Sequence, residues 1–412
     1  MTKQNNNTGK WHWRFTGNAE ELIQDLLQYL ERFEDFSDGE VLKSSVSRTV
    51  IAFPSASSQS GLIIKRYNVR GFKETLKYFF LNSRAFSEWT ALRHLQTFDV
   101  AVPRPLAFGE KKSGEILMGA GLVMEKLTDT QGINQWLWDR RAGHPERIEI
   151  LRQVGYQVAR LHDARCRHSD LHSGNILIQE GEPKGKPQVV LIDHHVCRIG
   201  KMPSERQRRH NLAKLFHSLL PKITHREAME LLRAYDEARA MPKWGTSGLQ
   251  RVLDDLVCRA NRLQEIRLRS RLKRCWKNSS QFARTVSKGW LVYRRREIPL
   301  DSLQVFQEGQ INFEAISEAP SGVLVGETTF ELKNGGKRVL VKQCSYNGFW
   351  RLMWYRFFPG PLHKEWGAAR SREVRGIPNP KALALMVQYR YGLPVREILI
   401  RERLGENNGK SY

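Results

Sequence analysis

Hydrophobic positions in the first third of the chain alternate over short stretches that are typical of strands. Such runs lie at 47–53 and 61–67, and a further buried strand is expected at 121–127. Apolar residues at helical spacing predict helices at 18–32 and 85–97. This part of the chain is therefore expected to form a small sheet accompanied by helices.

The pattern then changes to helical periodicity. Residues 145–163 form the clearest amphipathic helix, and two short apolar strands follow at 175–178 and 189–193. Beyond them the chain is helical and increasingly basic, from 206–220 to a run that ends near residue 277. A small sheet-rich part followed by a larger helical part predicts an α+β fold of two lobes, and ligand clefts often lie between such lobes.

Charge is the unusual feature of the composition. The 412 residues include 67 Lys and Arg against 43 Asp and Glu, a formal net charge of +24. Such an excess favours a polyanionic partner, which could be nucleic acid, an anionic membrane face or a phosphorylated substrate. A well-solvated basic surface is the simpler interpretation, because net charge speaks to association and not to fold.

The cysteine content and the lack of long apolar runs indicate a cytoplasmic location. Five cysteines are scattered without a Cys-x-x-Cys pair, which argues against a disulfide framework or a structural zinc site and suits a reducing cytoplasm. The N-terminus lacks the apolar core of a signal peptide, and no apolar run approaches the roughly 20 residues that span a bilayer. We expect a cytoplasmic protein, with peripheral contact at a membrane left open.

The strongest chemical motif is the segment His-Ser-Asp-Leu-His-Ser-Gly-Asn at 168–175, followed by an apolar strand. Phosphoryl transfer requires a carboxylate at the attacking hydroxyl and oxygen ligands that hold magnesium on the phosphates. Asp170 and Asn175, five positions apart on one loop, can supply these two functions. A second buried strand ends in Asp193, a further oxygen ligand of the kind that magnesium prefers. The alternative is that Asp170 merely caps a turn.

These residues resemble the catalytic and metal-binding loops of the protein-kinase-like superfamily, and also the loop of aminoglycoside and choline phosphotransferases. The resemblance implies ATP and Mg²⁺ as cofactors, and it implies that Lys65 contacts the phosphates while Glu88 holds that lysine. His194-His195 replaces the usual Phe-Gly, which counts against an ordinary serine/threonine protein kinase. No further ligand at a suitable spacing supports a transition-metal site at this pair. The glycine-rich loop is not recognisable in KSSVSRTV.

A narrower resemblance covers roughly residues 40–225. Lys65, Arg70-Gly71, the basic aromatic stretch 72–86 and Ser87-Glu88-Trp89 are similar to the lipopolysaccharide kinase family, which includes 3-deoxy-manno-octulosonate and core heptose kinases. This resemblance implies ATP-dependent phosphorylation of a sugar hydroxyl in the lipopolysaccharide inner core. An anionic glycolipid would then be the partner, at the inner face of the inner membrane, and nucleic acid is not expected.

An internal repeat extends the picture. Val339-Leu340-Val341-Lys342 echoes Leu62-Ile63-Ile64-Lys65, and Glu-Trp follows 23 residues after each lysine. A Gly-Phe pair and a Phe-Phe pair recur between these points. No second Asp-x-x-x-x-Asn loop follows, so the second unit is expected to lack catalysis. Either the reading frame is truncated, which we favour, or the extra lobe is a regulatory or docking module.

The expected architecture is a bilobal protein-kinase-like α+β fold with a second, incomplete kinase-like N-terminal lobe at the C-terminus. The expected domains are a disordered tail at 1–17, an N-lobe at 18–127, a C-lobe at 128–270 and the second N-lobe at 271–412.

Two basic stretches have open interpretations. Residues 348–366 mix Trp, Tyr and Phe with Arg and Lys, as interfacial membrane segments do, although they could equally pack beneath a helix. Residues 259–277 could bind phosphates or nucleic acid, but a solvated helix face is the simpler interpretation.

Three functions compete. The first is a kinase of a sugar in the lipopolysaccharide core, the second a small-molecule phosphotransferase of the aminoglycoside or choline type. The third is a non-catalytic kinase-fold scaffold, against which the joint presence of Lys65, Asp170, Asn175 and Asp193 argues.

Overall fold

The computed structural model describes residues 10–17, 19, 23, 39–45, 47–54, 60–69, 78, 81–181, 185–242, 244–308, 314–319, 323–332 and 335–403. The chain divides into two compact units, Met1–Leu263 and Gln264–Tyr412, and the division falls inside helix α9 (Gly245–Leu272). The boundary predicted at 270/271 lies near the end of the same helix. The helix predicted at 18–32 and the aromatic stretch 72–80 lie outside the described residues, apart from isolated positions.

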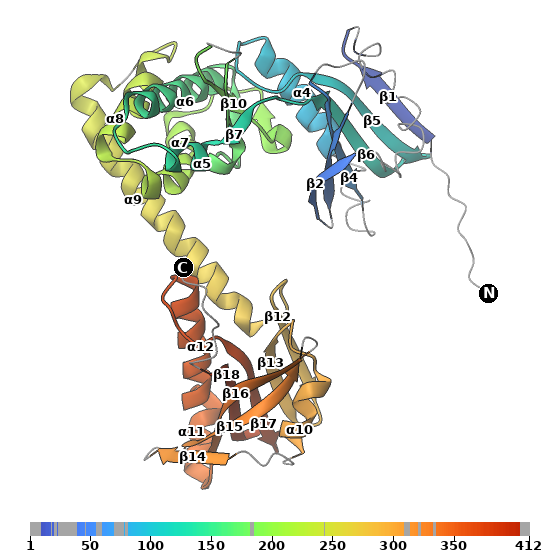
Figure 1. The fold of residues 1–412 in the computed structure, drawn as a ribbon, viewed down its shortest axis with the longest axis vertical. Coiled ribbons are helices and arrows are strands. Elements are labelled where there is room, and N and C mark those ends of the chain that lie inside the picture. Colours follow the sequence, from blue (N-terminus) through green and yellow to red (C-terminus); the bar gives the residue numbers. More distant parts are fainter. Residues whose placement is uncertain are drawn as a thin grey trace. The chain divides into compact units, whose positions relative to one another are not determined.

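The first unit begins with a six-stranded antiparallel sheet in the order β1-β5-β6-β4-β3-β2 (Figure 1). Its strands are β1 (Lys10–Phe15), β2 (Glu40–Ser44), β3 (Arg48–Phe53), β4 (Leu62–Asn68), β5 (Pro105–Ser113) and β6 (Ile116–Glu125). Helix α4 (Arg84–Gln96) packs against β5 and β6. It begins where the Ser83 side chain accepts a hydrogen bond from the Phe86 backbone N–H at 3.1 Å, which is a typical N-cap.

Strand β1 corrects one prediction. The tail expected to be disordered over 1–17 instead contributes residues 10–15 to the sheet, paired with β5. The reason is the alternation of Trp11, Trp13 and Phe15, which pack against the core while the residues between them are exposed. Trp13 lies over Gly109 of the neighbouring strand, where a Cβ atom would approach the indole ring to 2.5 Å. A glycine is therefore required at that position.

The rest of the first unit is a helical lobe that carries short strands. Its helices are α5 (Ile133–Trp138), α6 (Pro145–Asp163), α7 (Glu205–Leu219), α8 (His225–Glu237) and the first part of α9. Its strands are β7 (Thr130–Gly132), β8 (Cys166–His168), β9 (Ile176–Gln179), β10 (Gln188–Leu191) and β11 (Cys197–Ile199). They form two small sheets, β10-β9-β7 and β11-β8. The helix predicted at 145–163 has those bounds as α6.

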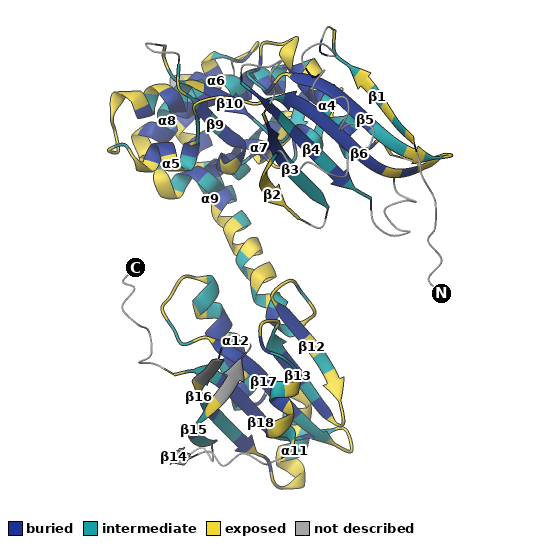
Figure 2. Ribbon diagram, turned by 45° about the vertical axis from the view of Figure 1, so that its right-hand side comes forward, coloured by how far each residue is buried: buried dark blue, intermediate teal, exposed yellow. Residues whose placement is uncertain are grey.

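Local sequence explains where these helices begin. Helices α7 and α8 each start with a capping box, formed by Ser204 with Gln207 and by Thr224 with Glu227. Apolar faces of α6, α7, α8 and α9 then enclose one core, which Figure 2 shows as dark blue ribbon in this lobe. The loops that follow β8 and β10 emerge from this core, so the motif residues stand on a rigid support.

The second unit is built on a seven-stranded sheet in the order β12-β13-β17-β18-β16-β15-β14. Its strands are β12 (Phe282–Ser287), β13 (Trp290–Arg295), β14 (Glu314–Ala319), β15 (Val323–Leu332), β16 (Gly335–Ser345), β17 (Ala382–Arg390) and β18 (Leu393–Glu402). Its helices are α10 (Gln304–Gln307), α11 (Phe349–Phe357) and α12 (Pro361–Val374). Strands β17 and β18 carry the longest buried runs (Figure 2).

The two sheets share a topology. Strands β13, β17, β18, β16, β15 and β14 follow one another as β1, β5, β6, β4, β3 and β2 do in the first unit. The lysines of the sequence repeat occupy matching positions in the register. Lys65 lies between Val50 and Leu122 on its neighbouring strands, and Lys342 lies between Val325 and Leu399.

None of the described helices combines the length and the apolar character needed to cross a bilayer.

Candidate active site

Asp170 lies in the loop that follows strand β8. The loop is held by the backbone N–H of Asp170, which donates to Nδ1 of His168 at 3.2 Å. The Asp170 side chain is 57% exposed, and its Oδ2 lies 3.5 Å from Nε2 of His172. A carboxylate that is fixed at its backbone and open at its side chain can accept a proton from a bound hydroxyl.

Asn175 ends the short 3₁₀ turn η2 (Ser173–Asn175) and is buried. Its Nδ2 donates to the backbone carbonyl of Asp170 at 3.0 Å, which directs the amide oxygen away from that carbonyl. Its own carbonyl accepts from the Ile192 N–H at 3.0 Å. Asn175 is therefore linked both to Asp170 and to the residue that precedes Asp193.

Asp193 follows strand β10 in the left-handed region, with φ of 66°. Its Oδ1 accepts from Nη1 of Arg48 at 2.7 Å and lies 2.6 Å from Nδ1 of His195. Nζ of Lys65 lies 3.9 Å from the same oxygen. Among the described residues, every contact to this carboxylate reaches Oδ1, so Oδ2 remains open to a cation.

Burial alone would raise the pKa of Asp193. The hydrogen bond from His195 and the charges of Lys65 and Arg48 outweigh that effect and hold the pKa of this carboxyl well below its ordinary value. Asp193 is consequently ionised at neutral pH, as a magnesium ligand must be.

Lys65 of β4 and Glu88 of α4 form the second half of the site. Nζ of Lys65 lies 2.5 Å from Oε1 of Glu88, whose side chain is 1% exposed. Glu88 also accepts from the Tyr67 hydroxyl and from the His194 backbone N–H. Burial acts to raise the pKa of Glu88, but the Lys65 charge and the hydrogen bonds from Lys65 and Tyr67 lower it overall. The helix carboxylate thus connects the strand lysine to the turn that contains Asp193.

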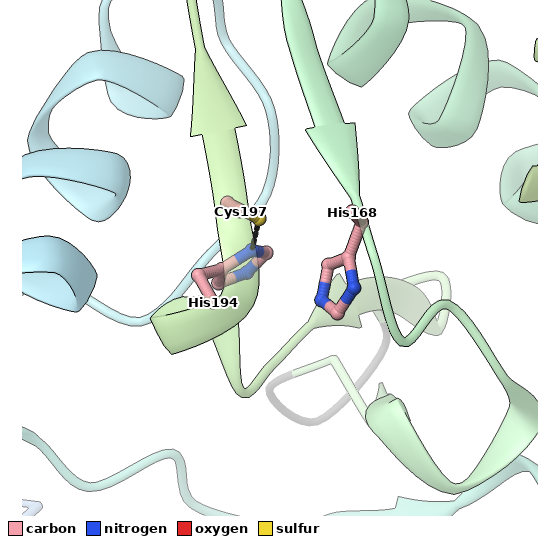
Figure 3. A group of neighbouring side chains, drawn as sticks. All are labelled: His168, His194 and Cys197. Carbon is pink, nitrogen blue, oxygen red and sulfur yellow. Dashed lines mark hydrogen bonds between the residues drawn. The ribbon is translucent and has the colours of Figure 1, made fainter. Parts of the chain in front are cut away.

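Figure 3 shows His168, His194 and Cys197, whose ligand atoms lie within 4.8 Å of one another. His194 Nε2 lies 2.9 Å from the carbonyl of Leu191, so this nitrogen carries the proton, and Nδ1 contacts Cys197 Sγ at 3.5 Å. Nδ1 of His168 already accepts from the Asp170 N–H, so its other ring nitrogen also carries a proton. Protonated in this way, the ring of His168 cannot bind a metal through that nitrogen. The cluster instead packs the loop that carries Asp170 against the turn after Asp193, with the ring centroids of His168 and His194 5.3 Å apart.

The oxygen atoms near Asp193 fit magnesium bound to ATP. Asp193 supplies a free carboxylate oxygen and Asn175 an amide oxygen, which are the hard ligands that magnesium requires. Lys65 and Arg48 add positive charge beside the Asp193 carboxylate. This charge would offset the repulsion between that carboxylate and the phosphates of a bound nucleotide. The sequence named Lys65, Glu88, Asp170, Asn175 and Asp193, and the structure brings all of them into one network.

Three contacts were not expected from the sequence. Arg48 lies in the segment where a glycine-rich loop was sought, and nothing distinguishes it from the other arginines of so basic a chain. Tyr67 is two residues after Lys65 on the same face of β4, a spacing that could have revealed it. His195 looked like a departure from a motif, whereas it directly contacts Asp193.

Comparison with known proteins shows which family this part of the chain resembles. Residues 36–235 match the model of the lipopolysaccharide kinase (Kdo/WaaP) family. A 3-deoxy-D-manno-octulosonic acid kinase of Vibrio cholerae is 28% identical over 209 residues, which cover 48% of this chain and 84% of that protein. The enzyme of the same name from Xanthomonas campestris is 31% identical over 154 residues, 37% of this chain and 57% of the relative.

A solved structure of WaaP in complex with acyl carrier protein aligns over 62% of this chain and 98% of the other, with a TM-score of 0.46 and 21% identity. The family match spans the region that holds Lys65, Asp170 and Asp193. Residues 36–235 therefore match the lipopolysaccharide kinase (Kdo/WaaP) family, and their mixed helix and sheet content is consistent with a kinase-like fold.

Proposed function

We propose that the first unit transfers the terminal phosphoryl group of ATP to a sugar hydroxyl of the lipopolysaccharide inner core. The observation that carries this proposal is the continuous network from Glu88 through Lys65 to Asp193. The relatives named above support the acceptor class, and an octulosonic acid carries a carboxylate beside its hydroxyls.

Each residue has a defined task in this scheme. Asp170 accepts the proton of the attacking hydroxyl, and Lys65, held in position by Glu88, contacts the phosphates. Asn175 and Asp193 hold magnesium, which when bound neutralises the charge that develops on the transferred group. Because Glu88 and Asp193 belong to different lobes of the fold, the site is assembled only when the lobes are correctly packed.

The test is magnesium-dependent ATP turnover by the full chain, with and without lipid A–core acceptors, compared with Asp170→Ala. Turnover that needs both the acceptor and Asp170 supports the proposal. ATP turnover with an aminoglycoside or choline instead would favour the small-molecule alternative. ATP binding without transfer to any acceptor would favour the scaffold.

We further propose that the second unit repeats the N-terminal lobe. The matching strand order and lysine register support this, as does the ion pair of Lys342 Nζ with Glu365 Oε1 at 2.8 Å. Both lysines reach a glutamate 23 residues further on. In the second unit Nη1 of Arg401 lies 2.5 Å from the same Glu365 oxygen, where the first unit has the uncharged Met124 in the matching register. This additional cation distinguishes the second pair from the first.

Helix α11 supports a peripheral membrane contact, which we propose at the inner face of the inner membrane of a cytoplasmic protein. The helix buries none of its residues, and Trp350 and Phe357 are 84% and 74% exposed. Phe349, Trp354 and the adjoining Phe358 are also exposed, and Arg351 and Arg356 lie among them. Aromatic side chains interleaved with arginines suit the interface of an anionic bilayer.

A further inference from the structure

A cationic pocket lies beside the catalytic loop in the helical lobe. It has a volume of about 690 Å³ and is formed by residues of β8, β11, α7 and α9. Six of its lining residues are basic: Arg167, Arg198, Arg206, His210, Lys214 and Arg259. None of its lining residues is acidic.

Three of the four arginines of this pocket differ from their neighbours in how they are paired, whereas the fourth, Arg259, pairs with Asp255 at 2.8 Å. Within the described part of the chain, Arg167, Arg198 and Arg206 have no acidic partner. The adjacent arginines of α7 do have one, because Arg208 pairs with Asp163 at 2.8 Å and Arg209 with Asp255 at 3.1 Å. Acidic partners therefore balance the arginines around the pocket and Arg259 within it, while the charges of Arg167, Arg198 and Arg206 inside the pocket have no such partner among the described residues.

The strand register increases this concentration of charge. Arg167 of β8 and Arg198 of β11 are direct cross-strand partners. Like charges directly opposite one another on a two-stranded sheet are destabilising, so the arrangement calls for an anion between or above them. Burial and the nearby charges of Lys214, Arg259 and Arg167 lower the pKa of His210, in keeping with a positive field in the pocket.

The pocket contacts the residue that precedes the proposed catalytic base, Asp170. Ser169, which precedes Asp170, is one of its lining residues. Nζ of Lys214 donates to the backbone carbonyl of Ser169 at 2.5 Å. A ligand held here would consequently lie next to the loop that presents the Asp170 carboxylate.

We propose that this pocket binds an anionic substituent of the acceptor, a carboxylate or a phosphate, and thereby directs a neighbouring hydroxyl toward Asp170. The planar guanidinium groups of arginine match both anions, which accept paired hydrogen bonds from them. The nucleotide phosphates are assigned to Lys65 and Asp193, so the pocket serves the second substrate. This inference rests on the proposed function and adds the specificity of the acceptor site to it.

The test compares two double variants of equal charge change. Arg198→Gln/Arg206→Gln removes two exposed arginines of the pocket, whereas Arg251→Gln/Arg262→Gln removes two exposed arginines of α9 that do not line it. We expect the pocket variant to raise the KM for an acidic acceptor by about tenfold or more, with the KM for ATP unchanged. The α9 variant should leave both values as in the parent protein. A raised KM for ATP, or equal effects of the two variants, would overturn the proposal.

Equilibrium binding separates this inference from the proposed function. Calorimetry with free 3-deoxy-D-manno-octulosonic acid, its methyl ester and inorganic phosphate needs no turnover. The pocket is supported if the acid binds, the ester does not, and only Arg198→Gln/Arg206→Gln abolishes binding. Competition by inorganic phosphate would assign the site to a phosphate group of the acceptor. Equal binding of acid and ester, or no binding of either the acid or phosphate, would refute the pocket even if phosphoryl transfer is observed.

Discussion

The guanidinium of Arg48 lies 2.7 Å from Oδ1 of Asp193, so that strand β3 directly holds the carboxylate that follows strand β10. Both side chains are less than one-fifth exposed, at 16% and 19%. Arg48 stands where the resemblance leads one to look for a flexible glycine-rich loop. The side chain of Arg48 thus occupies the place where the resemblance predicts a glycine-rich backbone loop over the phosphates.

The first prediction concerns this arginine. Arg48→Gln should raise the KM for ATP by about tenfold, because a charge-assisted contact near the phosphates and Asp193 is lost. Steady-state kinetics at saturating magnesium measures the effect. Lys43→Gln, which removes an exposed charge on the neighbouring strand β2, serves as the control and should change little. An Arg48 variant with the parent KM would show that the ion pair only positions Asp193 in the free protein.

The two lysine–glutamate pairs permit a matched comparison. Lys65→Met should reduce phosphoryl transfer by about 100-fold or more, since the cation that Glu88 aligns toward the phosphates is removed. Lys342→Met makes the same change in the second unit and should leave turnover near the parent value, because that unit has no counterpart of the Asp170 loop. Comparable losses in both variants would mean that the second pair also contributes to the reaction.

Membrane contact through α11 can be measured directly. Trp350→Ala combined with Trp354→Ala should weaken co-sedimentation with phosphatidylglycerol vesicles by about tenfold, because two large exposed aromatic rings are lost. Tyr391→Ala, at the fully exposed turn between β17 and β18, removes an aromatic ring outside the helix and serves as the control. Retention of full vesicle binding by the tryptophan variant would contradict the proposed contact.

Packing of α6 against α8 predicts a stability effect. A Cβ atom at Gly155 would lie 2.2 Å from the backbone oxygen of Leu231, so Gly155→Ala should destabilise the first unit by about 1–3 kcal/mol or more. Gly248→Ala in α9 meets its nearest neighbour at an ordinary 3.5 Å and should be neutral or stabilise by up to about 1 kcal/mol. Urea unfolding of the full chain checks both variants, and equal midpoints would contradict the close packing of α6 on α8.

Buried histidines predict the pH dependence of stability. Burial, with a contribution from Arg208, lowers the pKa of His162 to about 3, and burial likewise lowers the pKa of His168 to about 3. In the unfolded chain both titrate near 6.5, so the unfolded state binds more protons between pH 6.5 and pH 3. Stability should therefore fall as the pH falls through this window, with each histidine contributing at most about 1.4 kcal/mol per pH unit.

Replacement of one histidine isolates its share of that slope. His162→Gln keeps a polar side chain near Tyr235 and Asn211 but removes the titrating ring. Although this variant will be less stable at neutral pH, its stability should depend less steeply on pH below 6.5. Urea unfolding at several pH values gives the slope, and an unchanged slope would refute the assignment.

Prediction from the sequence succeeded where the information is local. The helix at 145–163 has the predicted bounds, because its apolar spacing and Pro145 after the His144 cap define it within a few residues. The motif that joins Asp170 to Asn175 is equally local, since one short turn carries both. Strand β1 was missed although Trp11, Trp13 and Phe15 alternate, because the polar residues around them suggested a disordered tail.

The sequence by itself determined the chemistry that this protein carries: a carboxylate and an amide on one loop, a second carboxylate after a buried strand, and a lysine with a glutamate one helix away. Only the tertiary structure decided which distant groups surround them. Arg48 and Asp193 are 145 residues apart, and Arg167 and Arg198 meet only because β8 pairs with β11. Periodicity records which face of an element is buried, whereas an ion pair between remote segments depends on how complete elements pack, and short-range spacing contains no record of that.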